Sequence, residues 1–313
     1  MKDLRGKTDK EEIFSHVIVA VGNYAVPNIP DFPGIETFEG RILHSKDFKD
    51  AREFNGISVL IIGGSFSASD IAIQLIKFRT SSRIICSSRK ASIGIDQVPK
   101  EIEQRLLPEK IDGKNVTFKD GASASVDVII ICTGYIYHYP FLNGDLRFDI
   151  ESQRTALYPE GLYKGSIWTK GGNNKLFHIA NYETYLNCQI WDIQAIWIVK
   201  YIQGQLAGEL VSNEIMVKEA SEWEKKAGNA VSPFDMVAFM VELGKYMCKD
   251  IDYPPQYLDK GHALLVDTIK GRMSNVLGYR DNCMANMYTG NIAPSHHTKW
   301  IDAMDESVDL YLQ

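Results

Sequence analysis

Two adjacent glycines, Gly63 and Gly64, follow an apolar run and precede a segment with helical spacing. Glycine permits a tight turn and lets a ligand approach the backbone closely. The N-terminus of the helix that follows offers free N–H groups and the positive end of a dipole, and both favour an anion. This combination predicts a turn that binds the pyrophosphate of a dinucleotide.

The glycine pattern is incomplete, because a full G-x-G-x-x-G would place glycines where this chain has Ser65 and Ala68. Small residues at both positions still allow the helix to pack closely on the strand. The fingerprint is therefore weakened but not lost. A strand–helix–strand unit that binds no nucleotide remains an open alternative.

A basic pair, Arg89 and Lys90, ends the second strand of this unit. An acidic residue at that place would bind the 2′-hydroxyl of NAD, whereas basic residues suit the 2′-phosphate of NADP. A basic pair taken alone is more often solvated surface. Its position at the end of the second strand is what favours a phosphate ligand.

The apolar pattern predicts the elements that position these residues. Residues 57–62 predict a buried parallel strand, residues from 66 onward a helix, and residues 83–86 a second strand. Further strands are expected at 17–21, 126–135 and 176–181, a hairpin at 111–125, helices at 192–203 and over most of 221–249, and mixed helix and loop over 262–312. The segments VIVAVG and IIICTG are alike and bracket the unit, which suggests one domain inserted between two halves of another.

Length and composition are those of a soluble globular protein, with 313 residues, 45% apolar and 24% charged. The net charge of −6 argues against a nucleic-acid-binding protein, and no apolar run approaches the roughly 20 residues that span a bilayer. Five cysteines without C-x-x-C spacing fit reduced thiols in a cytoplasmic protein. No metal site is expected, because the adjacent His296 and His297 point in different directions on most backbones.

Three segments of the chain resemble one known family. FEGRILHSKDF, residues 38–48, has Phe38, Gly40, His44 and Phe48 at the spacing F-x-G-x-x-x-H-x-x-x-[FY], which resembles the signature of the flavin-containing monooxygenases. ICTGYIYHYPFL, residues 131–142, resembles the family's A-T-G-Y segment. The ending APSHHTKWIDAMDESVDLYL is most similar to the bacterial trimethylamine monooxygenase branch, and the resemblance covers nearly the whole chain. For His44 itself we expect a local role, as a buried residue that closes a loop with the aromatics.

The resemblance implies an α/β protein with two dinucleotide-binding domains, a Rossmann-like NADP domain being inserted into an FAD domain. We expect residues 1–50 and 135–313 to form the two FAD-domain segments and residues 51–134 the NADP-binding domain. The implied reaction uses NADPH and dioxygen to oxygenate a tertiary amine or sulfide through a C4a-hydroperoxyflavin. A homodimer is a possible assembly.

The family pattern also implies which residues contact the cofactors. Near NADP it places Gly63, Ser65, Phe66, Ser67, Ala68, Asp70, Arg89, Lys90 and Thr133. Near FAD it places Thr184, Asn187 and Gln194, with Tyr185 in the substrate pocket. The trimethylamine branch usually has Gln, Trp and Ser or Thr where this chain has Thr184, Tyr185 and Asn187, and it often has Tyr in place of Phe66, so the substrate stays open.

The family's first G-x-G-x-x-G, which holds the FAD pyrophosphate, has no counterpart before Phe14. The 13 preceding residues are too few for a unit of about 30 residues. The family's active-site Asn belongs to the same portion, so no catalytic residue is assigned and the FAD domain is expected to be incomplete. A non-catalytic NADP-binding protein is therefore the alternative, whereas the lack of a C-x-x-x-x-C or C-x-x-C pair argues against a disulfide reductase.

Overall fold

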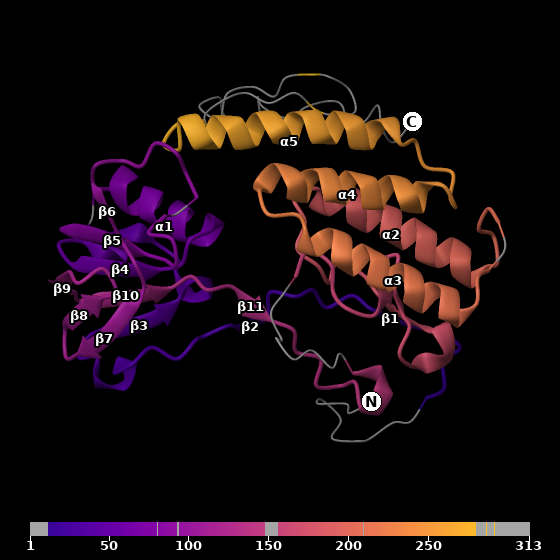
Figure 1. Ribbon diagram of the computed structural model, residues 1–313, viewed down its shortest axis with the longest axis horizontal. Coiled ribbons are helices and arrows are strands. Elements are labelled where there is room, and N and C mark those ends of the chain that lie inside the picture. The colour runs from indigo at the N-terminus through magenta and orange to yellow at the C-terminus, as the bar shows by residue number, and fades with distance from the viewer. Residues whose placement is uncertain are drawn as a thin grey trace. The chain divides into compact units, whose positions relative to one another are not determined.

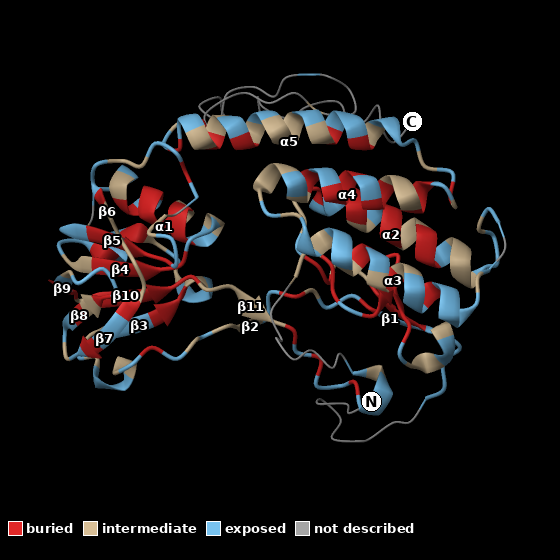
Figure 2. Cartoon of the chain, in the orientation of Figure 1, coloured by how far each residue is buried: buried red, intermediate tan, exposed pale blue. Residues whose placement is uncertain are grey.

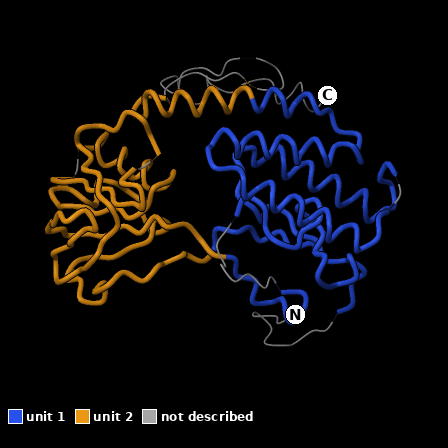
Figure 3. Tube along the Cα trace, viewed as in Figure 1, with its two compact units in different colours: residues 1–25, 137–262 blue, residues 26–136, 263–313 orange. Residues whose placement is uncertain are grey.

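The computed structural model describes residues 12–79, 81–92, 94–147, 156–208 and 210–279, together with residues 286 and 291. The chain divides into two compact units, shown in different colours in Figure 3. Unit 1 comprises residues 1–25 and 137–262, and unit 2 comprises residues 26–136 and 263–313. Unit 2 is thus inserted into unit 1 along the chain.

Unit 2 is built on a five-stranded sheet in the order β3-β10-β4-β5-β6, and all four strand pairs are parallel. The strands are β3 (Arg41–His44), β4 (Ser58–Ile62), β5 (Arg83–Ser87), β6 (Ile102–Arg105) and β10 (Val128–Ile131). The central strands β4 and β10 are apolar along nearly their whole length, as strands covered on both faces must be. A parallel sheet of this kind supports a dinucleotide-binding fold.

Both faces of this sheet are covered (Figures 1 and 2). Helix α1 (Phe66–Lys77) packs Ala68, Ile71, Ala72 and Leu75 against one face. The other face packs against an antiparallel meander of β7 (Pro108–Asp112), β8 (Asn115–Phe118) and β9 (Ser123–Ser125). A short ladder of β2 (Val26–Pro27) with β11 (Tyr135–Ile136) joins the two chain segments that enter and leave the unit.

Unit 1 contains a four-stranded sheet in the order β1-β14-β13-β12. Its strands are β1 (Val17–Val19), β12 (Leu162–Tyr163), β13 (Ile167–Trp168) and β14 (Leu176–His178). Strand β1 runs parallel to β14, whereas the other two pairs are antiparallel. Among the described residues no strand pairs with the outer edge of β1, and Val17 and Ile18 are each nearly half exposed.

Three helices accompany this sheet: α2 (Asn187–Ile202), α3 (Asn213–Gly228) and α4 (Pro233–Cys248). Helix α4 begins with a capping box between Ser232 and Asp235, followed by a proline at its first position. Helix α2 packs closely on α4 because Gly244 leaves room for the Ile190 side chain, which would lie 2.9 Å from an added Cβ. Helix α5 (Gln256–Ser274) follows, and no helix in the described part is long and apolar enough to cross a membrane.

The structure confirms the predicted α/β class and the strand–helix–strand unit at 57–86. The expected hairpin at 111–125 is present and has an additional strand, β7, on its N-terminal side. The strands expected at 17–21, 126–135 and 176–181 are present but shorter, and the helix expected at 192–203 begins five residues earlier, at Asn187. The segment expected over 262–312 lies largely outside the described residues.

The unit boundaries differ from the expected domain boundaries of 51–134. Unit 2 also takes in residues 26–50, because β3 adds an outer strand to its sheet beside β10. It takes in residues from 263 onward, and Val276 packs into the same core as α1. Long-range pairing decided both boundaries. The assignment of a cofactor to each domain remains a prediction.

Candidate functional site

The predicted NADP residues of unit 2 converge at one edge of its sheet. Gly63 follows the carboxyl end of β4, Thr133 follows that of β10, and Ser88 follows that of β5. These three strands are neighbours and all run in the same direction. Ligands of open parallel α/β sheets bind outside the carboxyl ends of the strands, so this edge is the candidate dinucleotide site.

The two glycines of the turn cannot be replaced without a clash. Gly63 has a φ of +155°, and an added Cβ would lie 2.3 Å from the backbone oxygen of Cys132. An added Cβ on Gly64 would lie 2.9 Å from the backbone oxygen of Ser92. Gly63 N–H donates to the oxygen of Ser87 at 2.8 Å, which ties the turn to the end of β5. The glycines are therefore required by the close approach of the Cys132 and Ser92 backbone, whereas the approach of a ligand that the sequence predicted stays a prediction.

The predicted phosphate-binding residues lie at the start of α1. Ser65 is the N-cap of the helix, and its side chain makes no capping hydrogen bond. Ser65 and Ser67 are exposed, Phe66 and Asp70 are half-buried, and Ala68 is fully buried against the sheet. No acidic residue stands in the first turn of α1, so nothing there opposes a bound anion.

The basic pair lies in an exposed turn directly after β5. The turn is held by Ser88, whose hydroxyl donates to the oxygen of Ser92 at 2.8 Å and accepts from its N–H at 2.9 Å. Arg89 and Lys90 are exposed, and within the described ranges neither forms an ion pair. Two unneutralised cations at the carboxyl edge of the sheet suit an exposed phosphate group.

The side chains of Thr133 and His44 serve the structure of the loops. The hydroxyl of Thr133 donates to the oxygen of Asn28 at 2.5 Å, and the Asn28 amide donates back to the oxygen of Thr133 at 3.0 Å. His44 is buried, and its Nε2 lies 3.0 Å from the oxygen of Gly134, while its Nδ1 accepts from the N–H of Lys46. Burial lowers the pKa of His44, which favours the neutral ring that this bonding requires. The local role expected for His44 is confirmed.

The predicted FAD and substrate residues lie in unit 1, around the start of α2. The hydroxyl of Thr184 accepts from the N–H of Leu186 at 3.1 Å, and Asn187 is the exposed first residue of α2. The Tyr185 hydroxyl lies 3.7 Å from the sulfur of Met236.

Gln194 is fully buried, and its amide is bonded on both sides. Its Nε2 donates to the oxygen of Gly165 at 2.8 Å and to the hydroxyl of Ser166, and its Oε1 accepts from Ala180 N–H at 3.3 Å. These bonds join α2 to the sheet. The geometry therefore gives Gln194 a structural role, and we do not include it among proposed flavin contacts.

Unit 1 contains buried amides that the sequence analysis missed. Asn23 and Asn181 follow the carboxyl ends of the adjacent parallel strands β1 and β14, and Gln189 lies in the first turn of α2. All three are at least 95% buried, and amide atoms of each have no hydrogen-bond partner in the described part of the chain. An unsatisfied buried polar group costs about 1–3 kcal/mol. The position of Asn23 directly after a strand and a glycine was the available sequence signal.

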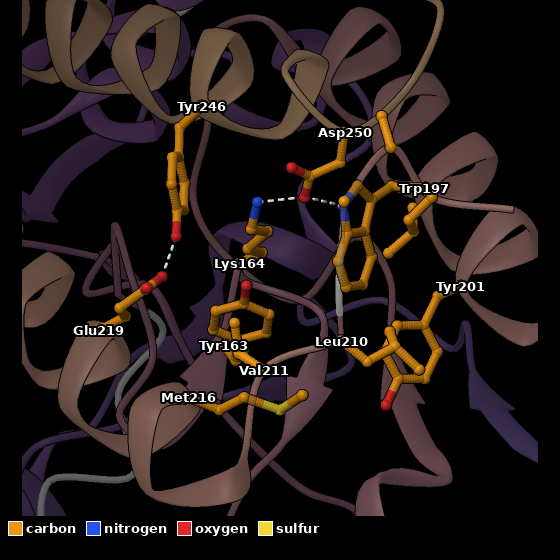
Figure 4. A pocket seen from close by; sticks show the side chains of 13 residues that line it. Tyr163, Lys164, Trp197, Tyr201, Leu210, Val211, Met216, Glu219, Tyr246 and Asp250 are labelled. Atoms are coloured by element: carbon orange, nitrogen blue, oxygen red, sulfur yellow. Dashed lines mark hydrogen bonds and ion pairs between the residues drawn. The ribbon is translucent and has the colours of Figure 1, made fainter. Parts of the chain in front are cut away.

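A pocket of about 210 Å³ also lies in unit 1, between α2, α3 and α4 (Figure 4). Its centre is the buried ammonium of Lys164, which is paired with Asp250 and lies 4.0 Å from the ring centroid of Tyr246. Asp250 also accepts from the indole N–H of Trp197 at 2.9 Å. The rings of Tyr163, Trp197 and Tyr246 thus already surround a cation of the chain itself. None of the predicted site residues lines this pocket.

Comparison with known proteins identifies the family. The sequence profile described as "Flavin-binding monooxygenase-like" matches residues 2–103 and 102–254. A trimethylamine monooxygenase from Methylocella silvestris is 38% identical over 99% of this chain and 67% of its own length. Another from Pelagibacter ubique is 32% identical over 98% of this chain and 68% of its own length. The chain thus spans about two thirds of the length of these relatives.

Solved structures agree with this comparison. The crystal structure of Tmm from a Pelagibacter strain superposes with a TM-score of 0.85 at 31% identity, over 99% of this chain and 68% of that chain. S-allyl-L-cysteine S-oxygenase from Allium sativum shares the fold, with a TM-score of 0.66 at 23% identity over 85% of this chain and 60% of that chain. The α/β architecture is that of the two-domain flavin monooxygenases, and the chain belongs to the flavin-binding monooxygenase-like family.

Proposed function

We propose that this chain is the NADPH-binding and substrate-side part of a flavin monooxygenase that oxygenates a small tertiary amine such as trimethylamine. One observation carries the proposal: the glycine turn, the N-terminus of α1 and the basic pair lie together at the carboxyl edge of one parallel sheet. The name trimethylamine monooxygenase, carried by the relatives reported above, supports the amine as substrate.

The residues of unit 2 fit NADP. The Gly63–Gly64 turn packs tightly against the backbone oxygens of Cys132 and Ser92 and leads directly into α1. The first turn of α1 carries no acidic residue, so the N–H groups at the helix start suit a diphosphate. Arg89 and Lys90 are the residues that would hold the 2′-phosphate. This set would discriminate NADPH from NADH through charge, since NADH lacks the phosphate that the basic pair would neutralise.

The residues of unit 1 fit part of an FAD site. Asn23, Asn181 and Gln189 offer buried amide donors and acceptors that lack partners in the described part of the chain, and a flavin ring with its ribityl chain carries matching groups. Asn23 and Asn181 stand after the carboxyl ends of adjacent parallel strands, which is the usual place for a nucleotide. We propose these three amides, together with Thr184 and Asn187, as the chain's contribution to flavin binding.

FAD, when bound, would supply the redox chemistry with dioxygen, because in flavoenzymes the cofactor and not the protein side chains carries that chemistry. The overall reaction balances as amine, dioxygen, NADPH and a proton giving amine N-oxide, NADP⁺ and water. The chain's own residues would bind and orient the nicotinamide nucleotide and exclude water around the flavin. A sulfide is the second candidate substrate, because it too presents a soft lone pair to an electrophilic oxygen.

The alternative is an NADP-binding relative without independent catalysis. Strand β1 favours this alternative, because it is the outer strand of its sheet and its apolar residues Val17 and Ile18 are nearly half exposed. Parallel strands are normally covered by other parts of the protein on both faces. Gly22 follows β1, but within the described residues no glycine turn leads directly from β1 or β14 into a helix that could hold the flavin pyrophosphate. We propose that further polypeptide must complete that site.

The experiment that separates these readings is FAD titration of the purified protein, followed by NADPH oxidation with and without trimethylamine. Bound flavin, NADPH consumption and a matching yield of trimethylamine N-oxide are the outcomes we expect of an active enzyme. NADP⁺ binding without flavin binding or N-oxide formation would establish the alternative. If neither nucleotide binds, the proposed function is wrong.

A further inference from the structure

A buried arginine lies beside the dinucleotide turn of unit 2. Arg272 stands near the end of α5, in the part of that helix that belongs to unit 2, and it is only 6% exposed. Within the described ranges no carboxylate forms an ion pair with it. A buried guanidinium without a counter-charge is costly, so its presence requires a reason.

The contacts of Arg272 lie in the first turn of α1 and in the loop after the basic turn. Its Nη2 donates to the hydroxyl of Ser69 in α1, and its Nη1 donates to the oxygen of Gly94 at 3.1 Å. Its guanidinium carbon lies 4.2 Å from the ring centroid of Phe66, the first residue of α1. Gly94 lies shortly after the turn that carries Arg89 and Lys90, so one side chain links the first turn of α1 to the loop that follows the basic turn.

The guanidinium also has unused bonding capacity. Its Nε is buried and has no hydrogen-bond partner in the described part of the chain. The positive charge therefore adds to the positive end of the α1 dipole at the place where the candidate site would receive a diphosphate. The start of α1 and the buried guanidinium, whose Nε has no hydrogen-bond partner in the described part of the chain, are two separate features that favour the same anion.

We propose that Arg272 is a positioning residue for the nucleotide diphosphate, acting through Phe66, Ser69 and Gly94. It would fix the start of α1, and its charge would lower the cost of binding an anion there. The inference rests on the proposed function, because it takes the Gly63–Phe66 segment to be the diphosphate site. It divides the recognition of NADP into a diphosphate part that depends on Arg272 and a 2′-phosphate part that depends on Arg89 and Lys90.

The flat guanidinium is suited to this place in a way that lysine is not. It stacks on an aromatic ring and donates along two directions at once, whereas an ammonium is a point charge on a flexible stem. Arg272→Lys should therefore keep the charge but lose the stacking and one of the two bonds. Arg272→Gln should keep much of the length but lose the charge.

The test measures equilibrium binding of NADP⁺, NAD⁺ and 2′-AMP to the whole chain by calorimetry. Arg272→Gln should lower the binding affinity for NADP⁺ and for NAD⁺ by the same factor, about tenfold or more, because charge-assisted contacts are lost. Binding of 2′-AMP, which has no diphosphate, should change less than about twofold. Arg272→Lys should fall between wild type and Arg272→Gln, and Lys270→Ala, which removes an exposed cation from the same helix, should match wild type.

Other outcomes would overturn the inference in distinguishable ways. If the wild type binds NADP⁺ and Arg272→Gln binds it equally well, Arg272 does not position the diphosphate, while the proposed function stands. If all three ligands weaken in parallel, Arg272 has only a general structural role. Should Arg272→Gln fail to fold by circular dichroism, Arg272→Lys decides the question through the same ratio of NAD⁺ to 2′-AMP affinities. A wild type that binds no NADP⁺ would refute the proposed function and this inference with it.

Discussion

The two units of this protein differ in how completely they satisfy their own polar and apolar groups. In unit 2 the parallel sheet is covered on one face by α1 and on the other by the β7–β9 meander. In unit 1 the outer strand β1 exposes Val17 and Ile18, and the amides of Asn23, Asn181 and Gln189 are buried without partners among the described residues.

The difference teaches which half of a two-nucleotide flavoprotein can form its site alone. Unit 2 brings its own glycine turn, helix start and basic pair to one sheet edge. Its buried Arg272, whose Nε has no hydrogen-bond partner among the described residues, favours an anion. Unit 1 brings amides and an open strand edge, which require a ligand or further polypeptide. NADP binding is therefore the property we expect this chain to show by itself, and flavin binding the property that depends on completion.

The largest effect should come from the turn of unit 2. Gly63→Ala would force a Cβ to 2.3 Å from the Cys132 oxygen, so we expect a loss of stability on the order of 3 kcal/mol and loss of NADP⁺ binding. The control is Gly56→Ala, at a positive φ with nothing within 4 Å of the added Cβ, which should cost about 1 kcal/mol. Urea unfolding followed by circular dichroism measures both. Equal losses in the two variants would contradict the close approach at Gly63.

A matched pair of glutamines on α2 tests the unsatisfied amides of unit 1. Gln194→Leu should destabilise the protein by about 1–3 kcal/mol, because it leaves the Gly165 oxygen and the Ala180 N–H without a partner. Gln189 is also buried, but its amide has no hydrogen-bond partner in the described part of the chain, so Gln189→Leu should be neutral or stabilising by up to about 1 kcal/mol without cofactor.

Tryptophan fluorescence during urea unfolding reports these changes mainly from unit 1, since four of the five tryptophans, Trp168, Trp191, Trp197 and Trp223, lie there. If Gln189→Leu destabilises the cofactor-free protein as much as Gln194→Leu does, the amide of Gln189 is already satisfied and the proposed flavin contact loses its support.

A smaller effect is the pH dependence of stability that one buried histidine of unit 1 should cause. His178 in unit 1 is fully buried, and burial lowers its pKa to about 3. Because the pKa is about 6.5 in an unfolded chain, the unfolded state binds the proton first, and stability falls as the pH drops from about 6.5 toward the folded value. The slope should not exceed about 1.4 kcal/mol per pH unit for this one group.

His178→Phe should remove that part of the pH dependence from the tryptophan-reported transition. Burial lowers the pKa of His44 in unit 2 as well, and its contribution has the same sign, so the variant should retain a residual slope. An unchanged slope in His178→Phe would show that His178 does not titrate on unfolding.

The sequence was sufficient for the elements whose patterns are local. The apolar run before Gly63 and the helical spacing after it predicted β4 and α1, and the alternation around Val116 predicted the hairpin. The tight turn at Gly63 was predicted from the same pattern, whereas its close approach to Cys132 came only from the structure.

Features that depend on distant partners were not predictable. Residues 41–44 join the sheet of unit 2 by pairing with β10, which stands more than 80 residues later. Arg272 reaches Ser69 across 203 positions, and nothing in its own segment distinguishes it from a surface arginine. Gln194 was assigned to the flavin because of its place in a family segment, whereas its bonds go to a loop 28 and 29 residues earlier.

The most direct test of the account is the ratio of NAD⁺ to NADP⁺ dissociation constants in the wild type and in the Arg89→Ala, Lys90→Ala double variant. We predict that the wild type binds NADP⁺ at least about tenfold more tightly than NAD⁺. Each substitution should weaken the binding free energy of NADP⁺ by about 1–3 kcal/mol and hardly change that of NAD⁺. Equal losses for both nucleotides, or a wild type that does not distinguish them, would contradict the claim that unit 2 holds the 2′-phosphate with this basic pair.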